Sequence, residues 1–335
     1  MTDMIDKYLA SAIKGIEWSL SILNADGSFH GSETTVTGHY KAPQTLATGG
    51  YMREAEQITA YIGSHFFSEG DFHCGPEEPA VPFYTNYKNA WLCWGAQTLG
   101  AYDLSSPGGD FLERAQNQKT GCLAEKCSEN ADEQTAEWGG TACGIVALLA
   151  MGRIKIAVKA GEGLIQMLDS QPKPSTHFYL RQNWAGEWIT DCPEVLASMF
   201  RVEYEKPAQT YWYFGIGMAA FGKLYLATGD SNWLEAGNRV FDLAAKMAPE
   251  SYQSLTSAKI GWGCATMYRC TGEKKFKDVA IQVADMLVET QTDEGVWLRT
   301  PQFDSVEKQP ITASLDTTLE RCNWLFEIIK GLQRG

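Results

Sequence analysis

Two kinds of helical segment alternate along this chain. In one kind, apolar positions repeat at helical spacing and charged residues occupy the opposite face, as in 278–287. In the other kind, apolar and small residues fill nearly every position, as in 212–222. A helix with one charged face is half exposed, whereas a helix that is apolar on all sides is buried. The pattern therefore predicts an outer and an inner layer of helices.

The segments occur in pairs, with the half-exposed helix first and the buried helix second. The half-exposed helices are predicted at 4–23, 51–66, 107–118, 154–170, 232–247 and 273–290. The buried helices are predicted at 42–48, 86–101, 139–151, 209–227, 254–269 and 315–330. Glycine, proline and polar clusters separate them, as expected at helix ends. The chain therefore consists of a series of helical hairpins.

A short glycine turn recurs where a buried helix gives way to the next half-exposed one. Ala-Thr-Gly-Gly at 47–50 is matched by Ala-Thr-Gly-Asp at 227–230 and by Cys-Thr-Gly-Glu at 270–273. Glycine tolerates the left-handed conformation that ends many helices. A repeated helix–turn–helix unit is typical of stacked hairpin arrays. We expect the three glycines Gly49, Gly229 and Gly272 to act as such caps.

An all-α (α/α)6 toroid, with two concentric rings of helices, is the predicted fold. It accounts for residues 1–335 as a single domain. The alternative is an open solenoid of hairpins, which requires polar capping helices at both ends. The segment 319–326 near the C-terminus is too apolar for a cap, so a closed ring is favoured.

Connection lengths predict the end of the ring that carries the site. The turns from buried to half-exposed helices are short, whereas the opposite connections are long and span 24–41, 68–85, 119–138, 171–208 and 291–314. Because the chain alternates direction, all the long connections emerge at one end. Long loops in a compact domain are usually functional. We expect a pocket there, lined by residues from 33–44, 72–91 and 184–209.

Candidate proton donors and acceptors lie in these loops and at the first turns of the buried helices. Tyr40 and Tyr87 each precede or begin a buried helix, and a tyrosine hydroxyl there can donate a proton. His39 and His73 are loop histidines, which suit acid–base chemistry at neutral pH. Asp191 is flanked by tryptophans, so we expect apolar surroundings that raise its pKa. These five residues are the catalytic candidates.

Neighbouring residues are candidates for binding the substrate. They are Lys41, Cys74, Lys88, Trp91, Trp184, Trp188, Glu205, Lys206 and Tyr211. Each also has a structural explanation, because a proline can fix the first helical turn and a lysine can extend outward to solvent. The aromatic loop at 178–188 is either a lid packed on its own core or a stacking wall for a ligand. The sequence leaves these alternatives open.

Composition restricts the class of protein. A net charge of −13 argues against nucleic acid or an anionic membrane as partner, because both require a basic surface. Neither a signal peptide nor a membrane-spanning run is recognised, and nine cysteines without framework spacing suit a reducing compartment. We expect a cytoplasmic protein that acts on a small molecule, with no cofactor and no metal. The sequence does not determine the oligomeric state, and a homo-oligomer is one of the alternatives.

Two segments resemble the repeats of squalene and triterpene cyclases. The Q-x3-G-x-W pattern of those repeats matches 291–297 and 182–188, and 24–29 is a degenerate copy. This resemblance implies an α/α-barrel fold more than it implies an activity. The D-x-D-D and D-D-x-x-D motifs are absent from the sequence, which disfavours a true triterpene cyclase or an ionising terpene synthase.

The order of several polar residues is similar to that in linalool dehydratase-isomerase. Tyr40, His73, Cys122 and Cys127 occur in a comparable order, with Glu33 as the nearest acidic counterpart. The resemblance implies cofactor-free acid–base chemistry on a small terpenoid. The turn at 226–230 is also similar to those of sugar-acting toroids, namely unsaturated glucuronyl hydrolases and N-acylglucosamine epimerases, although the R-H-x-x-D signature of the epimerases is absent.

Two functions follow from these observations. The first is a cofactor-independent lyase or isomerase (a dehydratase, cyclase or double-bond isomerase) acting on a small, largely apolar metabolite such as a terpenoid or polyketide. The alternative is a glycoside hydrolase or polysaccharide lyase that uses carboxylates in the same cavity. A non-enzymatic scaffold is the third class, and a closed ring with a lined mouth argues against it.

Overall fold

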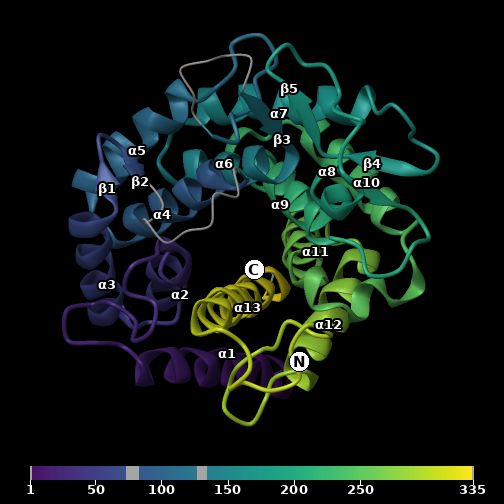
Figure 1. Cartoon of the computed structure of the whole chain (residues 1–335). Helices are drawn as coiled ribbons and strands as arrows, with labels where there is room; N and C mark the ends of the chain where they lie inside the picture. Colours follow the sequence, from purple (N-terminus) through teal and green to yellow (C-terminus); the bar gives the residue numbers. More distant parts are fainter. Residues whose placement is uncertain (1, 73–82, 127–133, 334–335) are drawn as a thin grey trace.

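The helices of the computed structural model form two concentric rings, as Figure 1 shows. The structure describes residues 2–72, 83–126 and 134–333. In this part of the chain the outer ring consists of α1 (Thr2–Ser21), α3 (Met52–His65), α5 (Tyr102–Arg114), α7 (Ile154–Asp169), α10 (Asn232–Ala244) and α12 (Lys274–Glu289). The inner ring consists of α2 (Ala42–Thr48), α4 (Thr85–Leu99), α6 (Trp138–Ala150), α9 (Trp212–Thr228), α11 (Ala258–Thr271) and α13 (Ile311–Leu332). The predicted (α/α)6 toroid is confirmed.

The inner ring is closed by its last helix. Helix α13 packs against α11 on one side and against α2 on the other, and the remaining inner helices contact one another in chain order. The first helix, α1, lies outside and packs mainly on α13 (Figure 1). Because the two ends of the array meet, no terminal helix has to cover an exposed apolar face, and an open solenoid is excluded.

Burial follows the two predicted patterns. In α6, all residues from Trp138 to Leu148 are buried, and α9 is buried from Tyr213 to Gly222. In outer helix α10, only one face is buried, and it includes Trp233, Ala236 and Val240. A helix enclosed by the outer ring and by its inner neighbours has no solvent-facing side, which explains why its polar residues are few.

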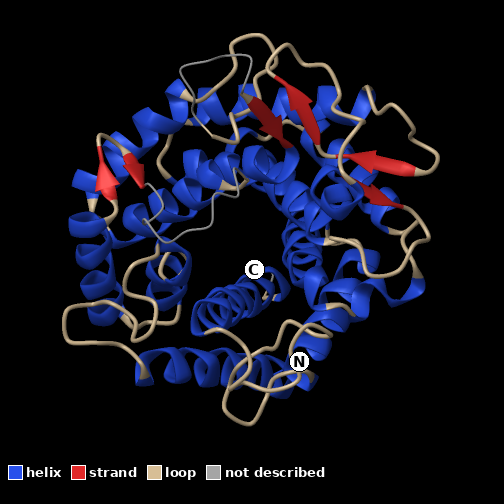
Figure 2. Ribbon diagram, in the orientation of Figure 1, coloured by secondary structure: helices blue, strands red, loops and turns tan. Residues whose placement is uncertain are grey.

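The remaining elements are short and lie in the connections (Figure 2). Three two-stranded antiparallel sheets pair β1 (Phe67–Ser68) with β2 (Asp71–Phe72), β3 (Thr135–Glu137) with β5 (Arg181–Asn183), and β4 (His177–Tyr179) with β6 (Arg201–Glu203). The short helical turns are η1 (Val36–Gly38), η3 (Glu194–Leu196), α8 (Ala197–Phe200), η4 (Pro249–Gln253) and η5 (Leu255–Ser257). The sequence pattern did not predict these elements, because each has too few residues to show a period.

Three helix starts differ from the prediction by four residues or more, and one of them is α11, which begins at Ala258 rather than at 254. Helix α5 begins at Tyr102, so Pro107 lies inside it, although the prediction placed the proline at its first turn. Helix α13 begins at Ile311 rather than at 315, directly after Pro310. Proline is favoured at a helix start but is not confined to it, so the position of a proline alone does not locate the first turn.

The glycine turns adopt the expected caps in two cases of three. Gly229 and Gly272 end α9 and α11 in the left-handed conformation, with φ of 75° and 74°. Gly49 is right-handed, with φ of −76°, and Gly50 takes the positive φ of 89° instead. These turns occupy one end of the ring, and the long connections occupy the other.

We expect Gly215→Ala to destabilise the fold, because α9 and α11 approach each other backbone to backbone. A Cβ at Gly215 would lie 2.0 Å from the carbonyl carbon of Lys259. Overpacking of this kind costs about 1–3 kcal/mol in the free energy of unfolding, which urea denaturation measures. The control is Gly63→Ala on outer helix α3, where the new Cβ would meet only side-chain atoms of Leu104, at 3.3 Å. Equal stability of the two variants would contradict the close approach.

Candidate functional site

Charged and aromatic side chains gather in the middle of the inner ring, near the ends of the long connections. We call this set the central cluster. It consists of Tyr40, Lys41, Tyr87, Trp91, Trp212, Lys259, Asp316, Glu320 and Trp324. Most of its members come from the first turns of α4, α9 and α11 and from the residues just before α2. Helix α13 extends further toward this end, so it contributes residues from its second turn onward.

Glu320 is at the centre of the cluster. The ammonium groups of Lys41 and Lys259 each donate a hydrogen bond to a different oxygen of its carboxylate. The indole Nε1 of Trp324 donates a third bond, of 3.0 Å, to Oε1. Burial alone would raise the pKa of Glu320, but Lys259 and Lys41 outweigh it and hold the pKa well below the ordinary value. Glu320 is therefore an ionised carboxylate.

Asp316 is one helical turn before Glu320 and is also held as an anion. Its Oδ1 lies 2.8 Å from Nζ of Lys41, and its Oδ2 accepts a hydrogen bond of 2.6 Å from the guanidinium of Arg299. Burial would raise the pKa of Asp316, yet Lys41 and Arg299 lower it overall. Lys41 thus bridges the two carboxylates of α13 from the N-terminal end of α2.

Tyr40 and Tyr87 supply buried hydroxyl groups. Their side chains are 5% and 6% exposed, and the ring centroids are 6.3 Å apart. Burial raises the pKa of both hydroxyls well above the ordinary value, and the nearby carboxylates raise it further. Both residues are therefore protonated at neutral pH, and they can donate a proton or a hydrogen bond.

Aromatic faces surround the ammonium group of Lys259. Its Nζ lies 4.7 Å from the ring centroid of Trp212 and 5.6 Å from that of Trp324. Trp324 in turn stacks on Trp262, with a centroid distance of 4.3 Å. Trp212 is half-buried, in contrast to the fully buried Trp91. The cluster thus combines a cation with flat apolar surfaces, one of which is partly open to solvent.

A second group of charges lies beside the central cluster. Glu125 accepts two hydrogen bonds from the guanidinium of Arg181, of 2.6 and 3.1 Å. Glu137 caps α6 by accepting the backbone N–H groups of Gly139 and Gly140. Burial raises the pKa of Glu137 to about 7, although Arg181 opposes the shift. This carboxyl group therefore changes charge near neutral pH.

Four of the predicted site residues are brought together. Tyr40, Lys41, Tyr87 and Trp91 all belong to the central cluster, and Nζ of Lys41 lies 4.9 Å from the ring centroid of Tyr40 and 6.0 Å from that of Trp91. Lys88 is adjacent in sequence to Tyr87, but its Nζ donates to Oγ1 of Thr37 at 2.7 Å. The aromatic–lysine pattern at the starts of buried helices thus marked one side of the cluster.

His39 is a core residue with no free ring nitrogen. Its Nε2 accepts the backbone N–H of Phe29 at 3.1 Å, and its Nδ1 is 2.9 Å from the carbonyl oxygen of Thr35. The ring packs against Phe29, Tyr61 and Phe66. Burial lowers the pKa of His39 to about 4. With both nitrogens bonded to the backbone, His39 has no position for a substrate, so we no longer include it among the catalytic candidates.

Asp191 does not have the apolar surroundings that motivated its selection, because the structure places it on the exposed surface. Trp184 and Trp188 are half-buried away from the cluster, and Nε1 of Trp188 donates to Oγ of Ser170 at the end of outer helix α7. The expectation of apolar surroundings is not met because the Asp191 side chain is exposed and Trp188 contacts the end of α7 instead. A nearby aromatic residue in the sequence does not establish burial.

The other predicted residues are outside the cluster. Glu205 and Lys206 are exposed, and Lys206 pairs with Glu203 at 3.2 Å. Tyr211 is buried, and its hydroxyl donates to the backbone carbonyl of Lys206. His73 and Cys74 lie outside the described residues.

The sequence analysis missed five of the nine residues of the cluster, namely Lys259, Asp316, Glu320, Trp212 and Trp324. One signal was present: positions 316, 320, 324 and 327 are acidic or tryptophan, at spacings of four, four and three in a segment predicted to be buried. This spacing puts them on one face of a helix. Polar residues on a face that must be buried indicate either ion pairs or a site.

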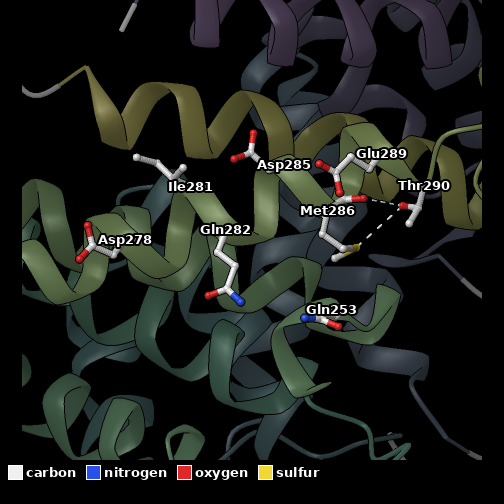
Figure 3. A pocket seen from close by; sticks show the side chains of 8 residues that line it. All are labelled: Gln253, Asp278, Ile281, Gln282, Asp285, Met286, Glu289 and Thr290. Carbon is white, nitrogen blue, oxygen red and sulfur yellow. Dashed lines mark hydrogen bonds between the residues drawn. The ribbon is translucent and has the colours of Figure 1, made fainter. Parts of the chain in front are cut away.

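Two of the hollows that the described residues form lie away from the predicted end. The larger is a groove of about 690 Å³ on the outer surface, lined by Gln253, Asp278, Ile281, Gln282, Asp285, Met286, Glu289 and Thr290 (Figure 3). The smaller, of about 20 Å³, lies at the short-turn end between α9, α11 and α13. The pocket expected among 33–44, 72–91 and 184–209 is thus not confirmed. Part of that set, residues 73–82, lies outside the described residues.

The described part of the chain offers neither a clustered metal site nor a membrane-spanning helix. His, Cys, Asp and Glu side chains do not gather there in any group of three suited to a metal ion. Within the same residues, every helix is too short or too polar to cross a lipid bilayer.

Comparison with known proteins places the fold among α/α toroid enzymes. No protein-family model and no curated protein matches the sequence. A D-mannose isomerase structure is similar over 98% of both chains, with 10% identity and a TM-score of 0.68. A heparin-specific unsaturated glucuronyl hydrolase (12% identity, covering 99% of this chain and 97% of that chain, TM-score 0.62) is also similar. A type II terpene cyclase from Scytonema is similar as well, with 12% identity over 99% of this chain and 100% of that chain and a TM-score of 0.61. At these identities the likeness establishes the fold alone.

Proposed function

We propose that this chain is a cofactor-independent lyase or isomerase that uses general acid–base catalysis in the central cluster. The observation that carries the proposal is the pair of buried, protonated hydroxyls of Tyr40 and Tyr87 beside a carboxylate that two lysines keep ionised. A hydroxyl that stays protonated beside an ionised carboxylate can serve as a proton or hydrogen-bond donor to a substrate, which acid catalysis requires. The cofactor-independent part of the proposal rests on the sequence, in which we recognise no nucleotide or phosphate motif.

The residues of the cluster have complementary roles in this proposal. Tyr40 or Tyr87 donates a proton to a leaving hydroxyl or to a double bond of the substrate, and the tyrosinate so formed then takes a proton from an adjacent carbon, which restores the hydroxyl. Trp212 and Trp324 present their faces to the apolar body of the substrate, and aromatic faces stabilise positive charge that develops there. Glu320 and Lys41 are already saturated by ion pairs, so they do not transfer protons in this proposal. Their role is to orient the hydroxyls and to set the local electrostatic potential.

The similar structures support a choice of reaction classes rather than one reaction. They include an isomerase and a cyclase, the latter described in complex with geranylgeranyl dihydroxybenzoate. They also include hydrolases. Because one fold supports many chemistries, this support is by analogy, and the roles of Tyr40 and Tyr87 carry the argument.

A glycoside hydrolase or polysaccharide lyase is the second candidate. Glu137 favours it, because a carboxyl group whose pKa is raised to about 7 can serve as a general acid. The GH76 α-mannanase of Bacteroides thetaiotaomicron has the same fold, at 13% identity and a TM-score of 0.65 over 95% of this chain. Against this candidate, Glu137 already caps α6, and both Asp316 and Glu320 are held by cations.

Isotope labelling separates the two candidates. The protein is incubated with panels of terpenoid alcohols, polyketides and oligosaccharides in ²H₂O and in H₂¹⁸O, and the products are analysed by mass spectrometry. A cyclase or double-bond isomerase places deuterium on carbon and a dehydratase yields a product lighter by one water, whereas a hydrolase places ¹⁸O in the product. Deuterium on carbon or loss of water, without hydrolysis, supports the proposal. Incorporation of ¹⁸O with cleavage of an oligosaccharide overturns it in favour of the hydrolase.

A further inference from the structure

The central cluster and its immediate neighbours carry more positive than negative charge. Among the described residues, the cations are Lys41, Lys259, Arg299 and Arg321, and the carboxylates are Asp316 and Glu320. Arg321 forms no ion pair in this part of the chain, because its guanidinium donates to the backbone carbonyls of Thr317 and Leu255. The side chain of Arg299 is 41% exposed and is screened by solvent, so Lys41, Lys259 and Arg321 exceed the two carboxylates by one buried positive charge.

An excess of buried positive charge is costly unless an anion compensates it. Removing an ion from water costs several kcal/mol, and proteins recover that cost by pairing the ion. Burial lowers the pKa of both Lys259 and Arg321, which reflects this cost. The helix ends add to the potential, since α4, α9 and α11 begin at the cluster and helix N-termini carry partial positive charge. The cluster is therefore electrostatically suited to an anion.

Lys259 is the cation that is best placed to bind one. Its side chain is 5% exposed, and within the described residues its Nζ donates to one acceptor, Glu320. Lys41, in contrast, contacts both carboxylates and the backbone carbonyl of Asp316. An ammonium group has three N–H donors. Lys259 thus keeps donor capacity on the side where it faces the rings of Trp212 and Trp324.

The aromatic residues of the cluster indicate what kind of molecule carries this anion. Trp212 is half-buried, and its ring lies 5.9 Å from Tyr84 and 5.8 Å from Tyr87, centroid to centroid. Tyr213 stacks on Trp212 with a centroid distance of 3.7 Å, so a ligand ring would contact the partly exposed side of Trp212 that faces Lys259, whose Nζ lies 4.7 Å from the ring centroid. The ammonium group of Lys259 and the ring of Trp212 are therefore close enough for one small ligand to contact both.

We propose that the central cluster binds a ring-bearing small-molecule carboxylate, with the carboxylate on Lys259 and the ring on Trp212. A carboxylate fits because the cluster already shows one, that of Glu320, between two ammonium groups. Calling this molecule a substrate depends on the proposed function, but the binding of the carboxylate does not depend on it. This inference narrows the class of substrate from a largely apolar metabolite to one that carries an acid group.

Matched pairs of probes test the inference. The probes are benzoate against benzyl alcohol, cyclohexanecarboxylate against cyclohexanemethanol, and inorganic phosphate alone, each followed by calorimetry and by tryptophan fluorescence. We expect the two carboxylates to bind at least about tenfold more tightly than their neutral partners, since charge-assisted hydrogen bonds are the stronger ones. Equal binding of acid and alcohol, or phosphate binding that matches the carboxylates, would overturn the inference. The two ring types distinguish a flat from a puckered body.

Variants of Lys259 and Trp212 test the two proposed roles, which are binding of the carboxylate and stacking of the ring. Lys259→Met is expected to abolish the preference for the acid, whereas Lys259→Arg keeps the charge and the preference. Trp212→Leu is expected to weaken both members of each pair while keeping the preference for the acid, because it removes the stacking surface and leaves the charge of Lys259 in place. Lys308→Met, at an exposed lysine paired with Asp304, is the control that changes nothing. Circular dichroism verifies folding, and an acid preference that survives in folded Lys259→Met, or that is lost in Lys259→Arg, refutes the assignment.

The test of the carboxylate site and the test of the proposed function can fail independently of each other. Carboxylate binding without any turnover leaves the binding site in place and removes support for the enzyme. Turnover of neutral substrates by Tyr40 and Tyr87, with no preference for acids, keeps the enzyme and removes the carboxylate site.

Discussion

Tyr40→Phe is expected to lower kcat by about a hundredfold or more while the fold survives. The substitution keeps the ring that packs beside Lys41 and Trp91 and removes only the hydroxyl. A positioned acid or base is worth roughly 10²–10⁴ in rate. Steady-state kinetics on a substrate identified by the isotope experiment measures the loss. Tyr87→Phe should show a loss of the same kind, because its hydroxyl lies in the same cluster.

Tyr61→Phe is the matched control for this prediction. Tyr61 lies on outer helix α3, and its hydroxyl donates to the backbone carbonyl of Glu33, outside the central cluster. The control should therefore keep full activity. A chelator added to the wild-type assay should leave the rate unchanged if the reaction uses no metal. Full activity in both Tyr40→Phe and Tyr87→Phe, or loss of wild-type activity by chelation, would remove the support for tyrosine acid catalysis.

Glu320→Gln is expected to reduce the free energy of unfolding by about 3–5 kcal/mol, the usual cost of breaking a buried ion pair from one side. The variant leaves Lys259 with no charged partner in the described residues, and Lys41 with Asp316 alone. Urea denaturation at pH 7 measures the difference. The control is Asp304→Asn, which breaks an exposed ion pair with Lys308 and should cost less than about 1 kcal/mol.

The pH dependence of this difference follows from the lowered pKa of Glu320. A carboxyl group whose pKa is lower in the folded state contributes stability above its unfolded pKa, which is about 4.3. That contribution is lost as the pH falls toward the folded pKa. The difference between wild type and Glu320→Gln should therefore be constant from about pH 5 upward and shrink below about pH 4. A difference that grows on acidification would contradict the lysine-held carboxylate.

The arrangement of the helices was largely predictable because burial imposes a period on the sequence. The alternation between segments such as 278–287 and 212–222 distinguished outer from inner helices. The glycines at 229 and 272 marked the turns because a left-handed cap requires them. Helix starts were less predictable: Pro107 suits the first turn of a helix, yet it lies inside α5 because packing against neighbouring helices outweighs that local preference.

The candidate site was predictable only where a local pattern exists. Tyr40, Lys41 and Tyr87 were found because they recur at the starts of buried helices. Glu320 was missed because its partner Lys41 is 279 positions away in the sequence. His39 was misjudged because its bonds to Phe29 and Thr35 use backbone atoms, which leave no trace in residue identity.

The sequence by itself determined that the chain forms paired helices in two layers, with long connections at one end. It did so because helical period, apolar content and glycine turns are local properties that each segment carries alone. The tertiary structure decided which residues of the inner helices meet at the centre. That choice depends on the rotation of each helix about its own axis. Close contacts such as that between Gly215 and Lys259 fix this rotation, and no single segment encodes it.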